Sequence, residues 1–118
     1  MSGVVMPEKV TVANGATTSS AIRLNGNRVV GVVLPAAITS TTATFELAFP
    51  ADIGAGDVAG TWKRAVSTAG TAMSITFVAN DYVVIDPSAL SGATWLRLVM
   101  GSAEGAAREI TLAVSKRM

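Results

Sequence analysis

Apolar and polar residues alternate along most of this chain, and this period of two limits its fold more than any other feature. Successive side chains of a strand point to opposite faces, so the pattern predicts sheets with one buried face and one wet face. Phe45, Leu47 and Phe49 share a face in this way, and Pro50 ends their segment. The pattern predicts about eight strands, drawn from nine candidate segments at residues 10–12, 22–24, 28–34, 44–49, 61–66, 73–77, 82–86, 96–100 and 110–114.

Turn-forming residues separate these segments, as in Asn14-Gly15 and Asn25-Gly26-Asn27. Helical periodicity is nearly absent, and only residues 86–92 could form a single helical turn. The length of 118 residues suits one domain, and a chain that is half apolar and 14% charged is expected to fold. We therefore predict an all-β, single-domain antiparallel β-sandwich, jelly-roll-like, with an N-terminal arm at 1–7 and the sandwich at 8–118.

The composition argues against most catalytic chemistry. The chain has no cysteine and no histidine, so thiolate nucleophiles, disulfides and the commonest metal ligand and general base are excluded. The eight carboxylates form no local motif for paired acid and base work. A net charge of +1 does not suit nucleic-acid binding, and no apolar run reaches the ~20 residues that span a bilayer. We expect no enzyme activity, no cofactor or metal, and neither nucleic-acid nor membrane partners.

The strand at 28–34, RVVGVVL, carries apolar residues on both faces. Strict alternation places Val29 and Val33 together on its second face, where exposure of each valine would forfeit roughly 1.5–3 kcal/mol. We expect a loop of the same chain, such as residues 50–60, or another subunit to cover them. Gly31 lies between them and is interpreted as a bulge or a close backbone approach, with chance drift as the alternative.

Two further groups are candidate interface residues. Val4, Val5 and Met6 precede Pro7, which should stop them from extending the next strand, so they form either a frayed end or an arm that docks on a partner subunit. Trp62 and Trp95 are expected to pack in the core or at a subunit interface. The alternative is that one of them is a stacking platform for a planar ligand, since Lys63 and Arg64 follow Trp62.

Longer stretches suggest a family. The segments VTVANGATTSSAIRLNG, RVVGVVLPAAIT, VVIDPSALSGATWLRLVMGS and REITLAVSKR follow one another in an order that resembles small virion proteins encoded by tailed bacteriophages. The resemblance covers roughly residues 10–117 and rests on strand and turn motifs. The chain departs from the pattern at AFPADIGAGDVAGTWKRAV, where a short acidic Asp-Gly turn is expected. We expect partner-specific contacts in that loop.

The resemblance implies a structural virion protein that acts as a capsid decoration or cement protein. Such a protein binds the outside of the phage head and stabilises neighbouring major capsid subunits, and is commonly a homotrimer. The implied location is the head surface, with assembly in the host cytoplasm. A tail, neck or fibre-base component is the alternative. A carbohydrate-binding module is the third possibility, and it requires Trp62 or Trp95 to be exposed on a concave sheet.

Overall fold

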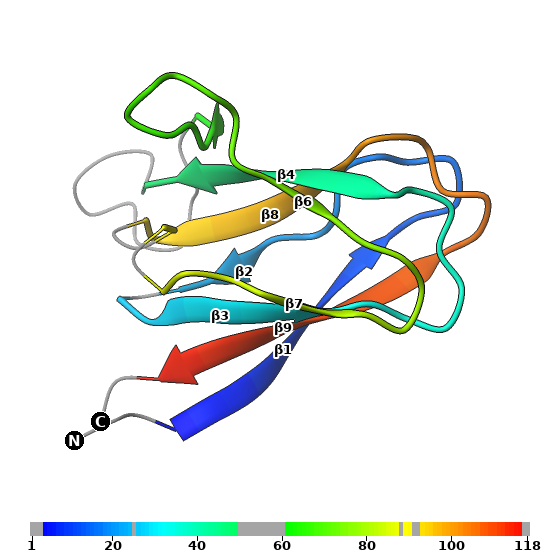
Figure 1. The fold of residues 1–118 in the computed structure, drawn as a ribbon, viewed down its shortest axis with the longest axis horizontal. Helices are drawn as coiled ribbons and strands as arrows, with labels where there is room; N and C mark the ends of the chain where they lie inside the picture. The colour runs from blue at the N-terminus through cyan, green and yellow to red at the C-terminus, as the bar shows by residue number, and fades with distance from the viewer. Residues whose placement is uncertain (1–3, 25, 50–60, 88, 91–92, 117–118) are drawn as a thin grey trace.

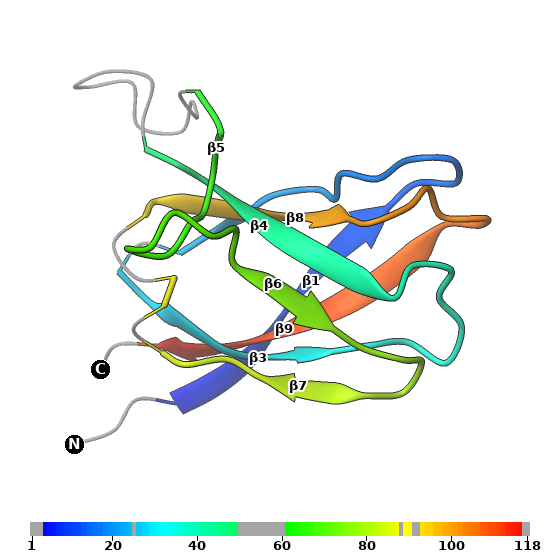
Figure 2. The same cartoon turned by 45° about the horizontal axis from the view of Figure 1, so that its top comes forward.

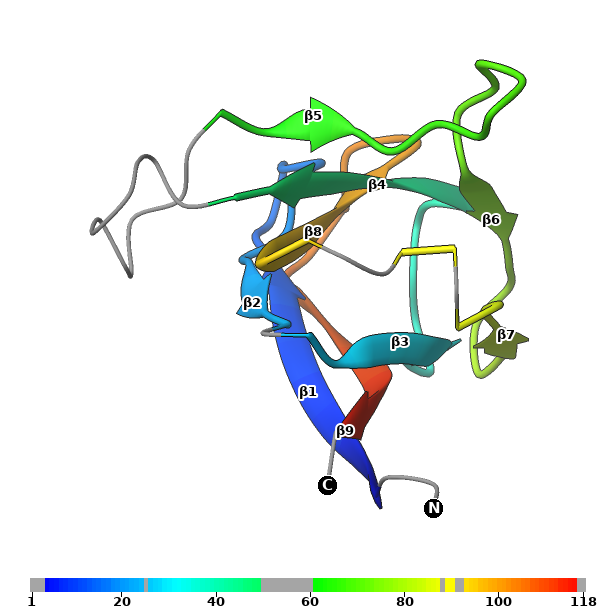
Figure 3. The same cartoon turned by 90° about the vertical axis from the view of Figure 1, so that its left-hand side faces the viewer.

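The chain folds into two antiparallel sheets, as the alternation predicts (Figure 1). The computed structural model describes residues 4–24, 26–49, 61–87, 89–90 and 93–116, and these contain no helix. Figure 3 shows the sheets as two layers, with β4, β5 and β8 in one and β1, β9 and β3 in the other. The strands are β1 (Val4–Val12), β2 (Ile22–Arg23), β3 (Arg28–Val33), β4 (Thr42–Ala48), β5 (Lys63–Arg64), β6 (Ser74–Thr76), β7 (Tyr82–Val84), β8 (Trp95–Met100) and β9 (Arg108–Lys116).

The strands pair in a nested order. The first strand, β1, pairs with the last, β9. Moving inward from both ends of the chain, β2 pairs with β8, β3 with β7 and β4 with β6. This long antiparallel ribbon then folds over, so that β3 also pairs with β9 and β4 with β8. The resulting sheets are β1-β9-β3-β7 and β2-β8-β4-β6, with the two-residue β5 added on β4. This is the strand order of a jelly roll, and it confirms the predicted fold class.

The core lies between the two inner faces, and the alternating residues fill it. The first sheet contributes side chains such as Val10, Ile110 and Leu112, and the second contributes Phe45 and Leu98. These side chains are almost fully buried. Each is worth roughly 1.5–3 kcal/mol relative to exposure, so their burial is the main driving force for closing the sandwich. The predicted partner of Phe45, Phe49, instead lies beyond the end of β4 and is exposed.

A β-bulge in β3 changes which valines face the core. Val29 pairs with Val114 and Gly31 with Ala113, so Val30 is an extra residue that shifts the register. Val29 is therefore 1% exposed inside the core, whereas Val33 is exposed on the outer face of the same sheet. The prediction that Val29 and Val33 share a second face is wrong, because the bulge reverses the alternation between them. The interpretation of Gly31 as a bulge position is confirmed. Residues 50–60, the predicted cover, lie outside the described residues.

The N-terminal residues belong to the sheet. β1 continues without a break through Pro7, which pairs with Ala113, and Val4 pairs with Lys116, so the first and last described residues lie side by side (Figure 1). The prediction that Pro7 separates an arm from the strand is wrong. β1 is an edge strand, and an edge tolerates a residue without an N–H if that position faces away from the neighbouring strand.

The direction of Pro7 follows from Thr11, four residues further along β1. The Thr11 carbonyl accepts a hydrogen bond from the Ser20 N–H at 2.9 Å, on the edge of β1 that faces away from β9. The N–H and C=O groups of successive residues point to opposite edges of a strand. Pro7 and Thr11 are four residues apart, so the backbone groups of both point to the same edge. Because proline has no N–H, Pro7 leaves a gap in the row of backbone donors on the free part of this edge. This gap hinders pairing with another strand.

This arrangement predicts that Pro7→Val raises self-association through β1 while leaving the fold intact. Thr11→Val is the matched control. It introduces the same valine on the same edge, but the backbone N–H and C=O of Thr11 are already hydrogen-bonded to Ser20. Sedimentation velocity at several concentrations should show larger species for Pro7→Val than for Thr11→Val or the parent protein. Equal distributions for all three would contradict this role of Pro7.

Candidate functional site

The first sheet carries a band of outward-pointing apolar residues that crosses all four strands and is exposed except at Gly31 and Ala113. We call this band the outer face, and its residues are Val5, Pro7, Gly31, Val33, Tyr82, Val84 and Ala113. Val84 is 78% exposed, and Val5, Pro7, Val33 and Tyr82 are exposed too. The largest apolar patch on a soluble protein is often functional, so this band is the candidate interaction surface.

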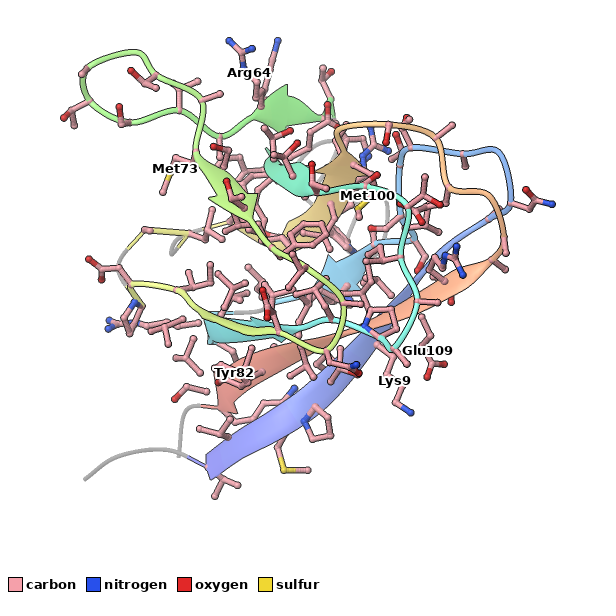
Figure 4. The ribbon with its side chains drawn as sticks, turned by 45° about the vertical axis from the view of Figure 1, so that its right-hand side comes forward. Lys9, Arg64, Met73, Tyr82, Met100 and Glu109 are labelled. Carbon is pink, nitrogen blue, oxygen red and sulfur yellow. The ribbon has the colours of Figure 1, made fainter. Side chains whose placement is uncertain are left out.

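The strand registers place these residues in rows across the sheet. One row runs from Pro7 through Ala113 and Gly31 to Val84. The next row contains Lys9, Thr111, Val33 and Tyr82. The charges of Lys9 and of its neighbour Glu109 compensate each other in an exposed ion pair of 3.2 Å, and Figure 4 shows the two side chains together. The band therefore has little net charge.

Gly31 allows the hydroxyl end of the Tyr82 ring to lie close to the backbone of β3. A Cβ atom on Gly31 would overlap the hydroxyl end of that ring. The close-approach interpretation of this glycine is thus confirmed together with the bulge. The tyrosine ring covers backbone that a glycine leaves bare.

The predicted interface residues of the first sheet do not all lie on one surface. Val5 and Val33 both lie on the outer face. Val4 and Met6 are exposed on the opposite side of β1 from Val5, because neighbouring residues of a strand alternate. Val29 lies in the core and is not available to a partner.

The two tryptophans lie on the second sheet, away from the outer face. Trp95 is 8% exposed, and the guanidinium of Arg23 lies 5.3 Å from the centre of its ring. Trp62 is half-buried, and the guanidinium of Arg97 stacks over it at 4.2 Å. Arg97 also forms a 2.7 Å ion pair with Glu46, which is opposite it on β4. Both rings are therefore engaged by arginines within the chain, in cation–π geometry.

Glu104 forms a buried polar cluster that the sequence does not reveal. Its carboxylate is 1% exposed and accepts hydrogen bonds from the backbone N–H groups of Thr39 at 2.8 Å and Ser40 at 2.9 Å. The Arg108 Nε donates to the same carboxylate at 3.0 Å. The Glu104 backbone exchanges hydrogen bonds with Gly15 and Ala16. One residue thus connects the β1–β2, β3–β4 and β8–β9 connections at one end of the sandwich.

The environment of Glu104 determines its ionisation. Burial alone would raise the pKa of Glu104, but the hydrogen bonds from Thr39, Ser40 and Arg108 together outweigh it and lower the pKa from 4.5 to about 2. A depressed carboxylate pKa means that the ionised form stabilises the fold. This contribution is fully present above about pH 4.5 and is lost as the pH falls through about 2. No spacing motif predicts this cluster, because Ser40 and Thr39 are 64 and 65 residues from Glu104 in sequence.

The described part of the chain shows no other concentration of chemical groups. It contains no set of three or more His, Cys, Asp or Glu residues that could hold a metal ion. Every buried side-chain nitrogen or oxygen among the described residues has a hydrogen-bond partner. Among those residues no helix is long and apolar enough to cross a membrane.

Comparison with known proteins adds no relative. The chain matches no protein-family model, no curated protein and no solved structure.

The Glu104 cluster predicts a specific pH dependence. Glu104→Gln should lower the free energy of unfolding at pH 7 by about 3–5 kcal/mol, because an amide cannot replace a carboxylate that accepts from several donors and pairs with Arg108. Loss of the ionisable group should also remove up to about 3 kcal/mol of the decline in stability between pH 4.5 and 2.

Urea unfolding at pH 7, 4.5 and 3 measures both effects. Glu109→Gln is the control, since the Glu109 side chain is 60% exposed and its ion pair with Lys9 is expected to contribute little. Parent-like stability of Glu104→Gln at pH 7, or an unchanged acid decline, would contradict the assignment.

Proposed function

We propose that this protein is a non-enzymatic structural subunit of a virus particle, a capsid decoration or cement protein that packs its outer face against neighbouring subunits. The observation that carries the proposal is the apolar band from Val5 to Val84, with its compensated Lys9–Glu109 charges. Covering exposed apolar residues with a partner lowers the free energy of the assembly. The particle itself is inferred from the resemblance of the strand and turn segments to small phage virion proteins.

The size of the outer face suits a contact that is repeated many times. Four strands spaced about 4.8 Å apart, with about five residues on each rising about 3.3 Å per residue, make a face on the order of 300 Å². A standard interface buries roughly 800 Å² on each partner. An apolar contact of less than half this size is weak in isolation, but several such contacts on one shell reinforce each other through effective concentration.

The proposed partners are further copies of the chain, as a homotrimer, and the major capsid protein on the head surface. Assembly takes place in the host cytoplasm. A tail, neck or fibre-base position would use the same outer face, and electron microscopy of particles carrying the labelled protein separates these locations. A carbohydrate-binding role is less well supported, because Trp95 is buried and Arg97 covers one face of Trp62.

The outer face predicts which substitutions weaken addition to particles. Val5→Lys and Val33→Lys should each weaken addition to particles stripped of this protein at least tenfold, because a lysine on the outer face must be desolvated on contact. Val78→Lys is the control, since Val78 is exposed in the β6–β7 connection and lies outside the outer face. Circular dichroism should show that all three variants keep the fold.

Binding is measured by co-sedimentation of the protein with stripped particles. Undiminished addition of both outer-face variants would rule out the outer face as the contact. Failure of the parent protein to bind any particle would overturn the particle assignment itself.

A further inference from the structure

A pocket opens between the two sheets on the side where β6 and β7 lie. Figures 2 and 3 show these two short strands on the same side of the sandwich, one in each sheet. The pocket has a volume of about 250 Å³. Figure 4 labels Met73 and Tyr82, which mark the two flanking segments. The lining residues that matter here are Phe45, Met73, Ile75, Val84, Asp86 and Leu90.

The chemistry and size of the pocket limit what it can hold. Its wall is mostly aliphatic and aromatic, and Asp86 is the one charged residue among the described residues that line it. Pockets for whole small molecules usually measure roughly 300–1,000 Å³, so this pocket is better matched to a single large side chain. A carboxylate at its margin favours a partner that brings a positive charge beside an apolar group.

The backbone next to the pocket is that of a free strand edge. The Leu34 N–H donates to the Asp81 carbonyl at 2.8 Å, and the Ile85 N–H donates to the Val30 carbonyl at 3.0 Å. These bonds mean that the odd-numbered residues of this segment face β3. Alternation then directs the N–H and C=O groups of Tyr82 and Val84 toward the opposite edge. Within the described residues β7 pairs with β3 alone, so these four groups can accept another strand.

We propose that an extended segment of a partner protein adds as a strand to the free edge of β7 and inserts a phenylalanine or leucine into this pocket. A lysine or arginine two residues from this anchor lies on the same side of the added strand and faces Asp86. The edge determines that the ligand is a peptide, since its unpaired donors and acceptors match a strand backbone. Because β7 has only three residues, the anchor side chain determines most of the affinity.

This site goes beyond the proposed function. It lies at the side of the sandwich, whereas particle packing uses the outer face. Val84 is the residue that borders both surfaces, since it lines the pocket and ends a row of the outer face. The test therefore uses the isolated protein without particles, so that each proposal can fail independently of the other.

The probe is the blocked heptapeptide acetyl-Thr-Lys-Val-Phe-Val-Lys-Thr-amide. Its central phenylalanine is the anchor, and each lysine is two residues away. We expect titration calorimetry to detect binding to the parent protein. Replacing the phenylalanine by alanine, or both lysines by glutamate, should weaken binding at least tenfold. Hydrogen exchange should slow at the amides of Tyr82 and Val84 when the parent peptide binds.

Two protein variants address the edge and the pocket separately. Val84→Pro removes an edge donor that takes no part in the β3 ladder, and Met73→Lys places a charge on the apolar wall. Each should weaken binding at least tenfold, whereas Val78→Lys should not change it. If Val84→Pro does not fold, Met73→Lys and the peptide series still test the site. No binding of the parent peptide at millimolar concentration, or equal binding of the alanine peptide, overturns the proposal.

Discussion

The buried carboxylate of Glu104 is the interaction on which one end of the sandwich depends. Three connections converge there: the N–H groups of Thr39 and Ser40 donate to this side chain, and the Gly15 N–H donates to the Glu104 carbonyl. An ionised group in such a place costs free energy through desolvation, and several donors must act together to outweigh that cost. These hydrogen bonds hold the ends of β1, β3 and β8 in one arrangement. The strands that begin after these connections therefore keep their registers.

The nested pairing of the strands extends this dependence to the whole chain. β1 and β9, the first and last strands, form the longest pair, and β3 joins them through β9. Most of the stabilising contacts therefore join segments that are distant in sequence. Such a topology requires the closure of long loops before its contacts form, so folding is expected to be slow compared with that of a helical protein of equal size. Protection of the exposed edges during this interval is a reason for a proline at position 7 of β1.

The two sheets present different chemistry to the surroundings. The first carries the apolar outer face, whose few charges compensate each other. The second carries tryptophans covered by arginines, with Glu46 paired to Arg97. Such engaged polar and aromatic groups are already satisfied within the chain, and they suit a surface that remains in water. A molecule with one apolar sheet face and one polar sheet face is suited to lie flat on a larger assembly, and this asymmetry supports the proposed function.

The alternation of residues determined the fold class, most of the strands and most of the core. Val10, Phe45, Leu98 and Ile110 lie in the core where the period of two predicts them, because alternation along one strand is a local property of a pleated backbone. Val5 and Val33 were predicted as interface candidates, but only the strand registers place them on one sheet face. The function remains a proposal that rests on resemblance and on the outer face.

The tertiary structure alone decided the features that depend on neighbouring strands. The bulge at Val30 moved Val29 into the core, because register is a property of two strands and not of one sequence segment. Pro7 remained within β1 because that strand lies at an edge, and no local pattern says which strands are edges. Glu104 and the pocket beside β7 arise from segments far apart in sequence. Their chemistry exists only once the fold brings buried donors, or apolar walls, to one point.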